Sequence, residues 1–391
     1  MLYLRQNFSC CSCLMKIRSC LILLLFFAFG VFQSRAQDFA SWLSKLRIPQ
    51  MDTVSVIFLG DIMQHGQQLT AAKTKEGYDY LPCFAALAPR LKAADLSVVN
   101  IETAFAGAPY TGYPVFSSPD ALISDLKTSG VQLFLTANNH ICDQGQKGLV
   151  RSLDLFDSTG ILHTGTFRSP VERSQRYPLV VERKGIRIAF LCYSYGTNGF
   201  AVPAPFVVNL IDTATIAKDI LHAQQMRPDF IVACMHWGEE YKEQQSAHQK
   251  MLARFLTRNG VDIVIGAHPH VPQGMEVVRL ASGEIKNIIA YSLGNVVSNM
   301  TLPNTQIGLL AEIKFMKHGF YKAIASFGYE WIATEHRYEG GIRKFYLLPI
   351  DQCTRNSASV SILPDGSARP SLYFKTDTLP DNTITFKLKP Y

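Results

Sequence analysis

The stretch at 261–270 constrains the fold of this chain most strongly. Its first residues are mostly Val and Ile, which favour a covered strand, and the run ends at Gly266, where the backbone can turn sharply. His268 and His270 then stand on the loop that leaves the strand, and Pro269 between them restricts the backbone. Two imidazoles presented in this way could hold a metal ion at little ordering cost. On its own, however, such a pair is also consistent with a turn that carries two surface histidines.

The same arrangement recurs in other parts of the chain. Apolar runs at 54–59, 96–99, 131–137 and 230–235 predict further buried strands, and each is closely followed by side chains that can bind metals. In open α/β sheets, sites form at the carboxyl ends of strands, so we expect these side chains to converge. The predicted ligands are Asp61, Glu102, Asn139, His236, His268 and His270.

The chemistry of this set indicates more than one ion. Three imidazoles, two carboxylates and an amide oxygen exceed what one tetrahedral zinc ion requires. They suit two divalent ions bridged by a carboxylate, about 3.5–4 Å apart. Mixed nitrogen and oxygen ligation fits Mn, Fe, Zn or Mg and does not select among them. The alternative is that Asp61 and Glu102 are helix N-caps after their strands, and that His140 is a hydrogen-bonded turn residue.

The charge composition argues against one class of partner, nucleic acid. The formal charge is +7, but the first 36 residues hold four basic side chains and no acidic one. Without them the chain has 34 basic and 31 acidic side chains, and no basic run is interleaved with aromatic residues. We therefore expect no nucleic-acid partner.

The amino terminus has the pattern of a secretory signal at 1–36. Lys16 and Arg18 precede an apolar run at 20–32, and small residues end at Ala36, where cleavage is expected. The apolar run is short for a membrane span, which needs roughly 20 residues. We expect export to the periplasm or cell envelope, with an uncleaved N-terminal membrane anchor as the alternative.

Six short blocks carry a resemblance to a known family. They are Gly60-Asp61-Ile62-Met63, Asn100-Ile101-Glu102, Ala137-Asn138-Asn139-His140 with Asp143, His236-Trp237-Gly238 with Glu240, Gly266-Ala267-His268-Pro269-His270, and Tyr291-Ser292-Leu293-Gly294-Asn295. In this order they resemble the CapA/PgsA capsule-synthesis family, a branch of the calcineurin-like metallophosphoesterases, over about residues 54–335. The resemblance implies an α/β fold, a four-layer αββα sandwich of the metallo-dependent phosphatase type, with a small C-terminal β appendage.

The resemblance also implies a role for each candidate side chain. Glu102 stands where the superfamily has a bridging aspartate. His140 matches the histidine that donates a proton to the leaving group, and Asp143 is expected to orient it, so these two form the predicted catalytic pair. The remaining metal ligands are matched by Asp61, Asn139, His236, His268 and His270.

Some positions depart from the superfamily pattern. Its first motif is Asp-x-His, whereas this chain has Met63, a poor ligand for hard ions. His65 is therefore a candidate for the missing imidazole. Glu240 and Asn295 are further candidates for a metal ligand or for the rim of the site.

The resemblance also sets the expected domain organisation. The CapA-like core is predicted at 53–300, the strands that complete it at 301–338, and the C-terminal appendage at 339–391. No internal repeat or low-complexity tract interrupts this plan.

Taken together, the residues and the resemblance predict an exported protein of capsule or poly-γ-glutamate synthesis or anchoring. Its dinuclear site would hydrolyse a phosphoester, and its partners would be an extracellular anionic polymer, a phosphoester substrate and a capsule-synthesis membrane complex. Two alternatives remain open: a non-catalytic envelope protein that binds or tethers polymer, and a metal-dependent γ-glutamyl or peptide hydrolase. His140 favours catalysis, because a tether needs no acid for a leaving group.

Overall fold

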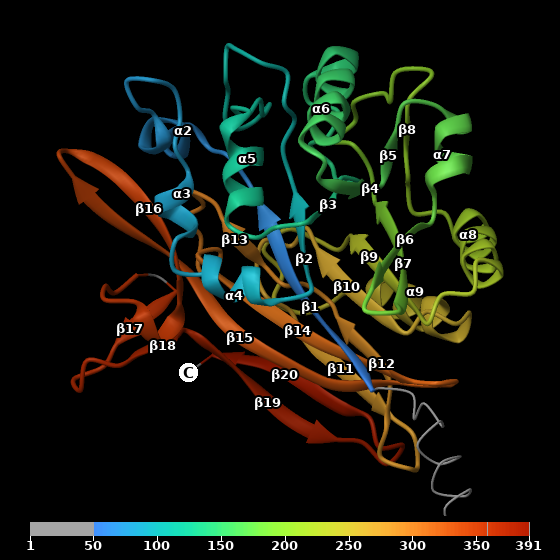
Figure 1. The fold of residues 1–391 in the computed structure, drawn as a ribbon. Coiled ribbons are helices and arrows are strands. Elements are labelled where there is room, and N and C mark those ends of the chain that lie inside the picture. Colours follow the sequence, from blue (N-terminus) through green and yellow to red (C-terminus); the bar gives the residue numbers. More distant parts are fainter. Residues whose placement is uncertain (1–50, 358, 391) are drawn as a thin grey trace, which may run out of the picture. The chain divides into compact units, whose positions relative to one another are not determined.

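The computed structural model describes residues 51–357 and 359–390 (Figure 1). The predicted signal at 1–36 lies outside the described residues. Within the described part of the chain, no helix is long and apolar enough to cross a membrane.

The core of the fold is a 16-stranded sheet that folds back on itself as two halves (Figure 1). In the first half, β4, β3, β2 and β1 are parallel neighbours. β14, β15 and β16 follow in order beyond β1, each antiparallel to the strand before it. The strands of this half are β1 (Asp52–Ile62), β2 (Leu96–Ile101), β3 (Leu133–Leu135), β4 (Leu162–Thr164), β13 (Asn295–Val297), β14 (Ile307–His318), β15 (Tyr321–Glu339) and β16 (Ile342–Pro349).

The second half contains the strand predicted at 261–267. Its order is β12, β10, β9, β7 and β6, and a single pair, Ile285 with Ile324, joins β12 to β15 of the first half. The strands of this half are β6 (Leu179–Arg183), β7 (Ile186–Ser194), β9 (Phe230–His236), β10 (Ile263–Ala267), β11 (Met275–Arg279), β12 (Ile285–Ala290), β19 (Leu372–Thr378) and β20 (Ile384–Pro390).

Helices and short ladders complete the fold. The helices are α2 (Gly66–Ala72), α3 (Leu81–Phe84), α4 (Ala88–Ala93), α5 (Ala121–Thr128), α6 (Gly145–Thr159), α7 (Pro170–Arg176), α8 (Thr213–Gln225), α9 (Ala247–Arg258) and the 3-10 turn η1 (Ile350–Gln352). The remaining strands are β5 (Thr166–Phe167), β8 (Val207–Val208), β17 (Val360–Ile362) and β18 (Ala368–Pro370).

Three hydrophobic clusters define four layers. One lies between the two halves of the sheet, where the Phe58 and Phe190 rings are 6.4 Å apart. A second joins the outer face of β1 and β2 to α4, α5 and α6, and a third joins the outer face of β7, β9 and β10 to α8 and α9. Because alternate strand residues face opposite sides, both faces of each half are apolar and covered. The predicted αββα sandwich is thus confirmed.

The C-terminal segment is built of strands, some of which extend the sandwich. β16, at the start of the segment predicted at 339–391, pairs with β15, and β20 pairs with β11. β17 and β18 form a separate two-stranded ladder. Apolar side chains of β17, β19 and β20, among them Val360, Leu372 and Leu388, form a fourth cluster with Ile307 and Leu348.

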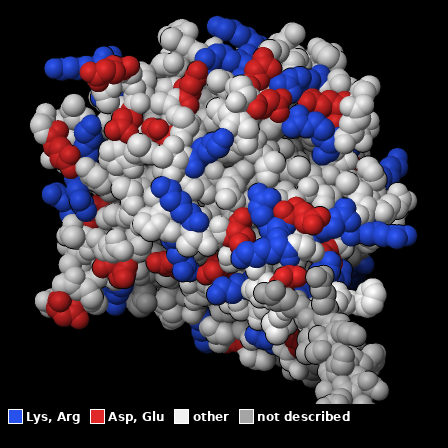
Figure 2. Space-filling model, in the orientation of Figure 1, with Lys and Arg blue, Asp and Glu red and all other residues white. Residues whose placement is uncertain are grey.

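Charged side chains of both signs alternate over the face seen in Figure 2. Charged side chains also form ion pairs with one another. Arg168, for example, lies 2.8 Å from Asp154, 2.8 Å from Asp157 and 3.0 Å from Glu172. Exposed pairs of this kind contribute little to stability, about 0–1 kcal/mol each. The fold therefore depends on its buried layers.

Two glycines allow the strands that carry predicted ligands to approach their neighbours closely. A Cβ atom on Gly60 would lie 1.8 Å from the carbonyl oxygen of Gly294. A Cβ atom on Gly266 would lie 1.9 Å from the carbonyl oxygen of Tyr291. Both distances are far inside van der Waals contact with backbone atoms, so only glycine fits here.

We expect Gly266→Ala to lower the free energy of unfolding by at least about 2 kcal/mol, because the clash is with backbone that cannot rotate away. Gly328→Ala, in β15, is the matched control, since nothing lies within 4 Å of its added Cβ. Urea unfolding of both variants measures the difference. Equal stability of the two variants would contradict the close approach.

Asp262 is a partly buried carboxylate that joins the starts of β9 and β10. Its Oδ2 accepts the Ile231 N–H at 2.8 Å, and its own N–H donates to the Ile231 carbonyl at 2.9 Å. Burial raises the pKa of Asp262 to about 6, above an ordinary value of about 3.9. The native state therefore binds more protons than the unfolded chain between about pH 4 and pH 6, so this group's contribution to stability is lost as pH rises through that window.

Asp262→Asn removes this titration. We expect the variant to match the wild type near pH 4 and to exceed its free energy of unfolding by about 1–2 kcal/mol at pH 8. Thermal or urea unfolding at both pH values measures this, with Asp351→Asn, an exposed carboxylate, as the control. A change of the same size at both pH values would show that the effect is not due to titration.

Candidate metal centre

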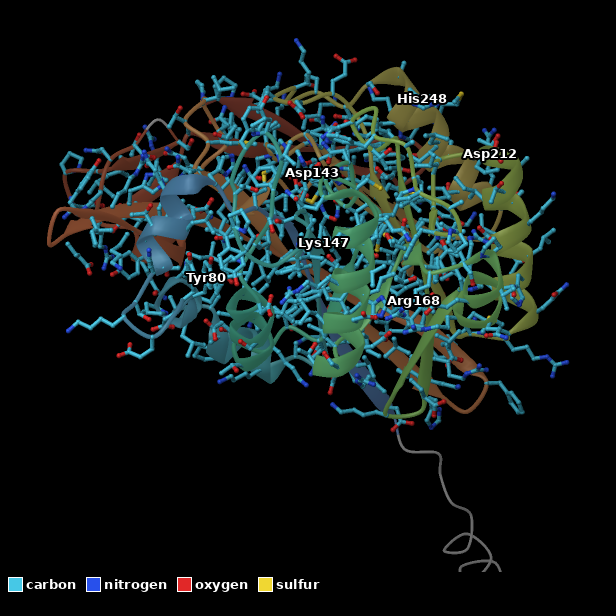
Figure 3. All side chains as sticks on the ribbon, turned by 90° about the horizontal axis from the view of Figure 1, so that it is seen from above. Tyr80, Asp143, Lys147, Arg168, Asp212 and His248 are labelled. Carbon is cyan, nitrogen blue, oxygen red and sulfur yellow. The ribbon has the colours of Figure 1, made fainter. Side chains whose placement is uncertain are left out.

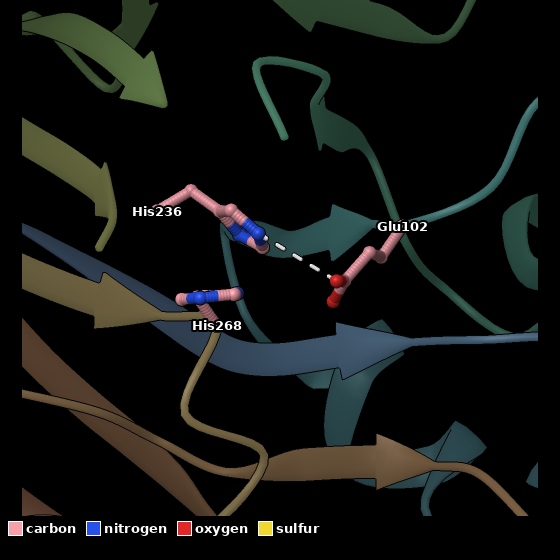
Figure 4. A group of neighbouring side chains, drawn as sticks. All are labelled: Glu102, His236 and His268. Carbon is pink, nitrogen blue, oxygen red and sulfur yellow. Dashed lines mark ion pairs between the residues drawn. The ribbon is translucent and has the colours of Figure 1, made fainter. Parts of the chain in front are cut away.

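The strand ends of both halves meet at one place. Asp61 is near the end of β1, Glu102 directly follows β2, His236 ends β9, and His268 directly follows β10. Figure 4 shows the side chains of Glu102, His236 and His268 pointing toward one another from three different strands. All four side chains are buried, and none of the four exposes more than 3% of its surface. The carboxyl-terminal ends of β1, β2, β9 and β10 therefore converge, as predicted.

Glu102 lies at the centre of this cluster. Its Oε1 is 3.5 Å from His236 Nε2 and 3.8 Å from His270 Nε2. Two ligand atoms that each lie about 2.1 Å from a tetrahedral ion are about 3.4 Å apart, so these spacings suit a shared ion. Neither carboxylate oxygen of Glu102 accepts a hydrogen bond from the described residues. A buried carboxylate without partners is costly, and a cation would satisfy it.

Three groups of side chains each bring their ligand atoms within 4.8 Å of one another. Glu102 belongs to two of them and His268 and His270 also belong to two each, so the groups overlap. This overlap is what a carboxylate-bridged pair of ions requires. The groups are Glu102, His236 and His268; Asp61, Glu102 and His270; and Glu240, His268 and His270.

Two asparagines hold these side chains in place. Strand register puts Asn100 on β2 and Asn295 on β13 opposite Asp61. Asn100 Nδ2 is 2.7 Å from Asp61 Oδ1 and 3.2 Å from His236 Nδ1, so one amide links the two halves of the sheet. Asn295 Oδ1 is 3.1 Å from His270 Nδ1. Such outer contacts fix the orientation of ligand side chains.

The loop after β10 is held in an unusual conformation. His268 has φ +97° and His270 has φ +59°, backbone angles that residues other than glycine rarely adopt. The His268 N–H donates to Asp61 Oδ2 at 3.1 Å, which helps to hold this loop against β1. Residues in such regions cost about 1–3 kcal/mol and concentrate at functional sites. The strain indicates that the two imidazoles are held where they are for a purpose other than stability.

The protonation states also suit a bound cation. Burial lowers the pKa of His268 to about 3, and burial lowers the pKa of His236 well below its usual value. Burial and the nearby Asp61 raise the pKa of Glu102 well above its usual value. Neutral imidazoles are the form that binds metal. A divalent ion would stabilise the ionised form of Glu102 and so reverse the effect of its burial.

His140 and Asp143 form the predicted pair beside the cluster. His140 Nδ1 is 2.8 Å from Asp143 Oδ2, which also accepts the Phe116 N–H at 2.8 Å. The Phe116 ring meets the His140 ring edge-on at 4.6 Å. Both partners are buried, and Figure 3 shows Asp143 near the centre of the molecule, whereas Asp212 and His248 lie at its edge. These contacts fix the orientation of the His140 ring.

Asn139 completes the cluster and leads to two residues that sequence reasoning missed. Asn139 Oδ1 is 2.8 Å from His236 Nε2, while its Nδ2 donates to Asn198 Oδ1 at 3.1 Å. Asn198 also lies 3.5 Å from His140 Nε2, and the Tyr195 ring lies 4.4 Å from the His268 ring. Both come from the irregular loop after β7, and no motif marks them. Their contacts, and the positive φ of Asn198, exist only in the fold.

The remaining candidates fall in different places. Glu240 belongs to one of the three groups, although it is exposed, and Asn295 lies behind His270 as an orienting residue. His65 belongs to none of the groups. It starts α2, and its Nδ1 accepts the Asn299 N–H at 3.3 Å. His65, the candidate for the missing motif histidine, is therefore hydrogen-bonded to Asn299 at the start of α2.

Known proteins place the chain in a family. The described fold and site are those of an α/β sandwich with a buried carboxylate and imidazole cluster able to hold divalent ions. Residues 55–300 match the family described as bacterial capsule synthesis protein PGA_cap, and the chain belongs to this family. The predicted resemblance is thus confirmed.

The individual relatives share only about a quarter of their residues with this chain. The chain is 27% identical over 295 residues to the PGA biosynthesis protein CapA of Bacillus subtilis, with 71% of this chain and 73% of the relative covered. It is 26% identical to the capsule biosynthesis protein CapA of Bacillus anthracis, with 68% and 65% covered. Among solved structures, the calcineurin-like phosphoesterase YfkN of Bacillus subtilis is 12% identical over 73% of this chain and 91% of that one, with a TM-score of 0.45.

Two of the three groups share Glu102, and this overlap makes a prediction about the number of bound ions. Purified protein should carry about two equivalents of divalent metal. Glu102→Ala should lose both, because it removes the shared ligand, whereas His236→Ala and His270→Ala should lose about one each. Elemental analysis after metal-supplemented purification measures this, and His248→Ala, an exposed histidine on α9, should retain the wild-type content. A Glu102→Ala protein with full metal content would exclude a bridging role.

Proposed function

We propose that this protein is an exported, metal-dependent phosphoester hydrolase that acts in the synthesis or anchoring of an extracellular anionic polymer. One observation carries the proposal: a fully buried carboxylate, Glu102, stands without hydrogen-bond partners between imidazoles of two overlapping groups. Family membership supports the biological context, and the names of the two CapA relatives point to capsule or PGA synthesis. The site supports the reaction.

The donor set fits a pair of divalent ions. Unpartnered oxygens of Glu102 and the unpartnered Nδ1 of His268 face a buried cluster in which Asp61 supplies a second carboxylate. Asp61, Glu102 and His270 would hold one ion, and Glu102, Asn139, His236 and His268 the other. Bound ions supply Lewis-acid polarisation of a phosphoryl oxygen and acidify water.

His140 supplies the proton-transfer chemistry. Asp143 holds His140 Nδ1, which leaves Nε2 as the nitrogen directed at a reacting group. Burial is the main cause that lowers the pKa of His236 and His268, and the His140 imidazole adds a smaller effect in the same direction. An imidazolium at this place can protonate the oxygen of a departing alcohol, and Asp143 stabilises that charged form.

A polymer tether does not need this arrangement. Binding an anionic chain requires exposed cations, whereas the groups gathered here are buried carboxylates, imidazoles and a positioned acid. Strained backbone at His268 and His270 also lowers stability without adding binding surface. These features favour turnover over tethering.

The role of His140 predicts a dependence on the leaving group. In metal-loaded protein, His140→Ala should lower kcat about 10²- to 10⁴-fold for a dialkyl phosphodiester. The loss should be much smaller for bis(4-nitrophenyl) phosphate, because 4-nitrophenolate leaves without a proton. Asp143→Asn should show the same pattern with a smaller loss, because Asp143 acts through His140.

Steady-state kinetics on both substrates and metal analysis of each variant measure this. Asp120→Asn is a control on a carboxylate that is bound by Arg151, at 2.6 Å, outside the site. Equal losses for both leaving groups would remove His140 from the role of acid. Metal-loaded protein without turnover of any phosphodiester would favour the tether.

A further inference from the structure

Asn198 stands at the edge of the candidate metal centre, on the irregular loop after β7. The residue is exposed and has φ +50°, a backbone angle that asparagine adopts more readily than most residues other than glycine. Its side chain reaches Asn139 and His140, which lie 59 and 58 positions earlier in the chain. One exposed amide thus contacts both a predicted metal ligand and the predicted acid.

The oxygen of this amide accepts two hydrogen bonds. The Tyr195 hydroxyl donates to Asn198 Oδ1 at 3.0 Å, and Asn139 Nδ2 donates to the same oxygen at 3.1 Å. Tyr195 is itself held against the cluster, because its ring lies 4.4 Å from the His268 ring and its N–H donates to the His236 carbonyl at 2.9 Å. An amide oxygen has two lone pairs, so these two donors use its full capacity.

The two ends of the Asn139 amide differ in chemistry. Its nitrogen only donates hydrogen bonds, whereas its oxygen is the atom that can bind a cation. Because Nδ2 is directed at Asn198, Oδ1 is turned into the cluster, where it lies 2.8 Å from His236 Nε2. If the Asn139 amide were rotated, its oxygen would face Asn198 Oδ1, and two acceptors would meet without a proton between them.

The other end of the Asn198 amide makes a weaker contact. Asn198 Nδ2 is 3.5 Å from His140 Nε2, at the outer limit of a hydrogen bond, whereas both bonds to Oδ1 are about half an ångström shorter. The geometry therefore favours a role for Asn198 through Asn139 over a role through His140.

We propose that Asn198 is a positioning residue of the metal centre, which sets the end of the Asn139 amide that faces a bound cation. Tyr195 supports it from the other side by donating to the same oxygen. The inference rests on the metal site of the proposed function but not on the hydrolysis, because it concerns the binding of the cation.

Co²⁺ is a suitable probe, because it binds to mixed nitrogen and oxygen ligands and its visible absorption depends on them. In titrations of chelator-stripped protein, Asn198→Gly should raise the Kd for Co²⁺ about 10- to 100-fold and change the absorption band. Glycine accepts the positive φ, so this variant removes the amide without straining the loop. Asn198→Asp retains the acceptor oxygen and should keep the Kd within about threefold of the wild type.

A double-mutant cycle separates positioning from a general effect on the loop. In an Asn139→Ala background, Asn198→Gly and Asn198→Asp should cause no further change in the Kd, because the amide on which they act is absent. Asn382→Gly is the matched control. Asn382 is exposed and has φ +62° in the turn between β19 and β20, so this variant should bind Co²⁺ like the wild type.

Three results would overturn the proposal: wild-type Kd and absorption in Asn198→Gly, an Asn198→Asp protein as weak as Asn198→Gly, or an equal loss with and without Asn139. In each case the wild type still binds Co²⁺, so the metal site of the proposed function stands. A wild type that does not bind Co²⁺ would overturn both. The expected Co²⁺ results without turnover of any phosphodiester would support the role of Asn198 and contradict only the hydrolysis.

Discussion

The site depends on one electrostatic constraint, the burial of Glu102 between the two halves of the sheet. Its carboxylate is fully covered, has no hydrogen-bond donor among the described residues, and faces imidazoles at 3.5 and 3.8 Å. Such a group takes up a proton unless a positive charge balances it. The surrounding asparagines and the strained histidine loop all act to keep the ligand atoms around this one carboxylate, and Asn100 does so across both halves.

Close backbone contact is what makes this arrangement rigid. Gly60 and Gly266 lie against the carbonyls of Gly294 and Tyr291, so the strands that present Asp61 and His268 cannot shift relative to their neighbours. Sites held within about 0.5 Å by such supports bind and react better than sites on free loops. The same packing places the positive φ of His268 within a frame that can absorb its strain.

The sequence predicted the parts of the site that follow from strand direction. Parallel strands must end on the same edge, so a ligand after each apolar run had to converge with the others, as Asp61, Glu102 and His236 do. The roles of Asn100 and Asn198 could not be predicted, because they depend on register and on contacts between residues more than fifty positions apart. The four layers follow from runs that are apolar on both faces.

His65 and Gln64 show where local pattern and fold diverge. The connection between β1 and α2 is held at Met63, whose N–H donates to the Val297 carbonyl at 3.1 Å and whose carbonyl accepts from Gln68 Nε2. These bonds fix the backbone, so Asp61 lies in the cluster that could hold a metal ion, Gln64 is buried outside it, and His65 precedes α2 as its N-cap. His65 Nδ1 accepts the Asn299 N–H, and His65 belongs to none of the three groups of ligand atoms. Glu240, which follows β9 in the other half of the sheet, does form such a group with His268 and His270.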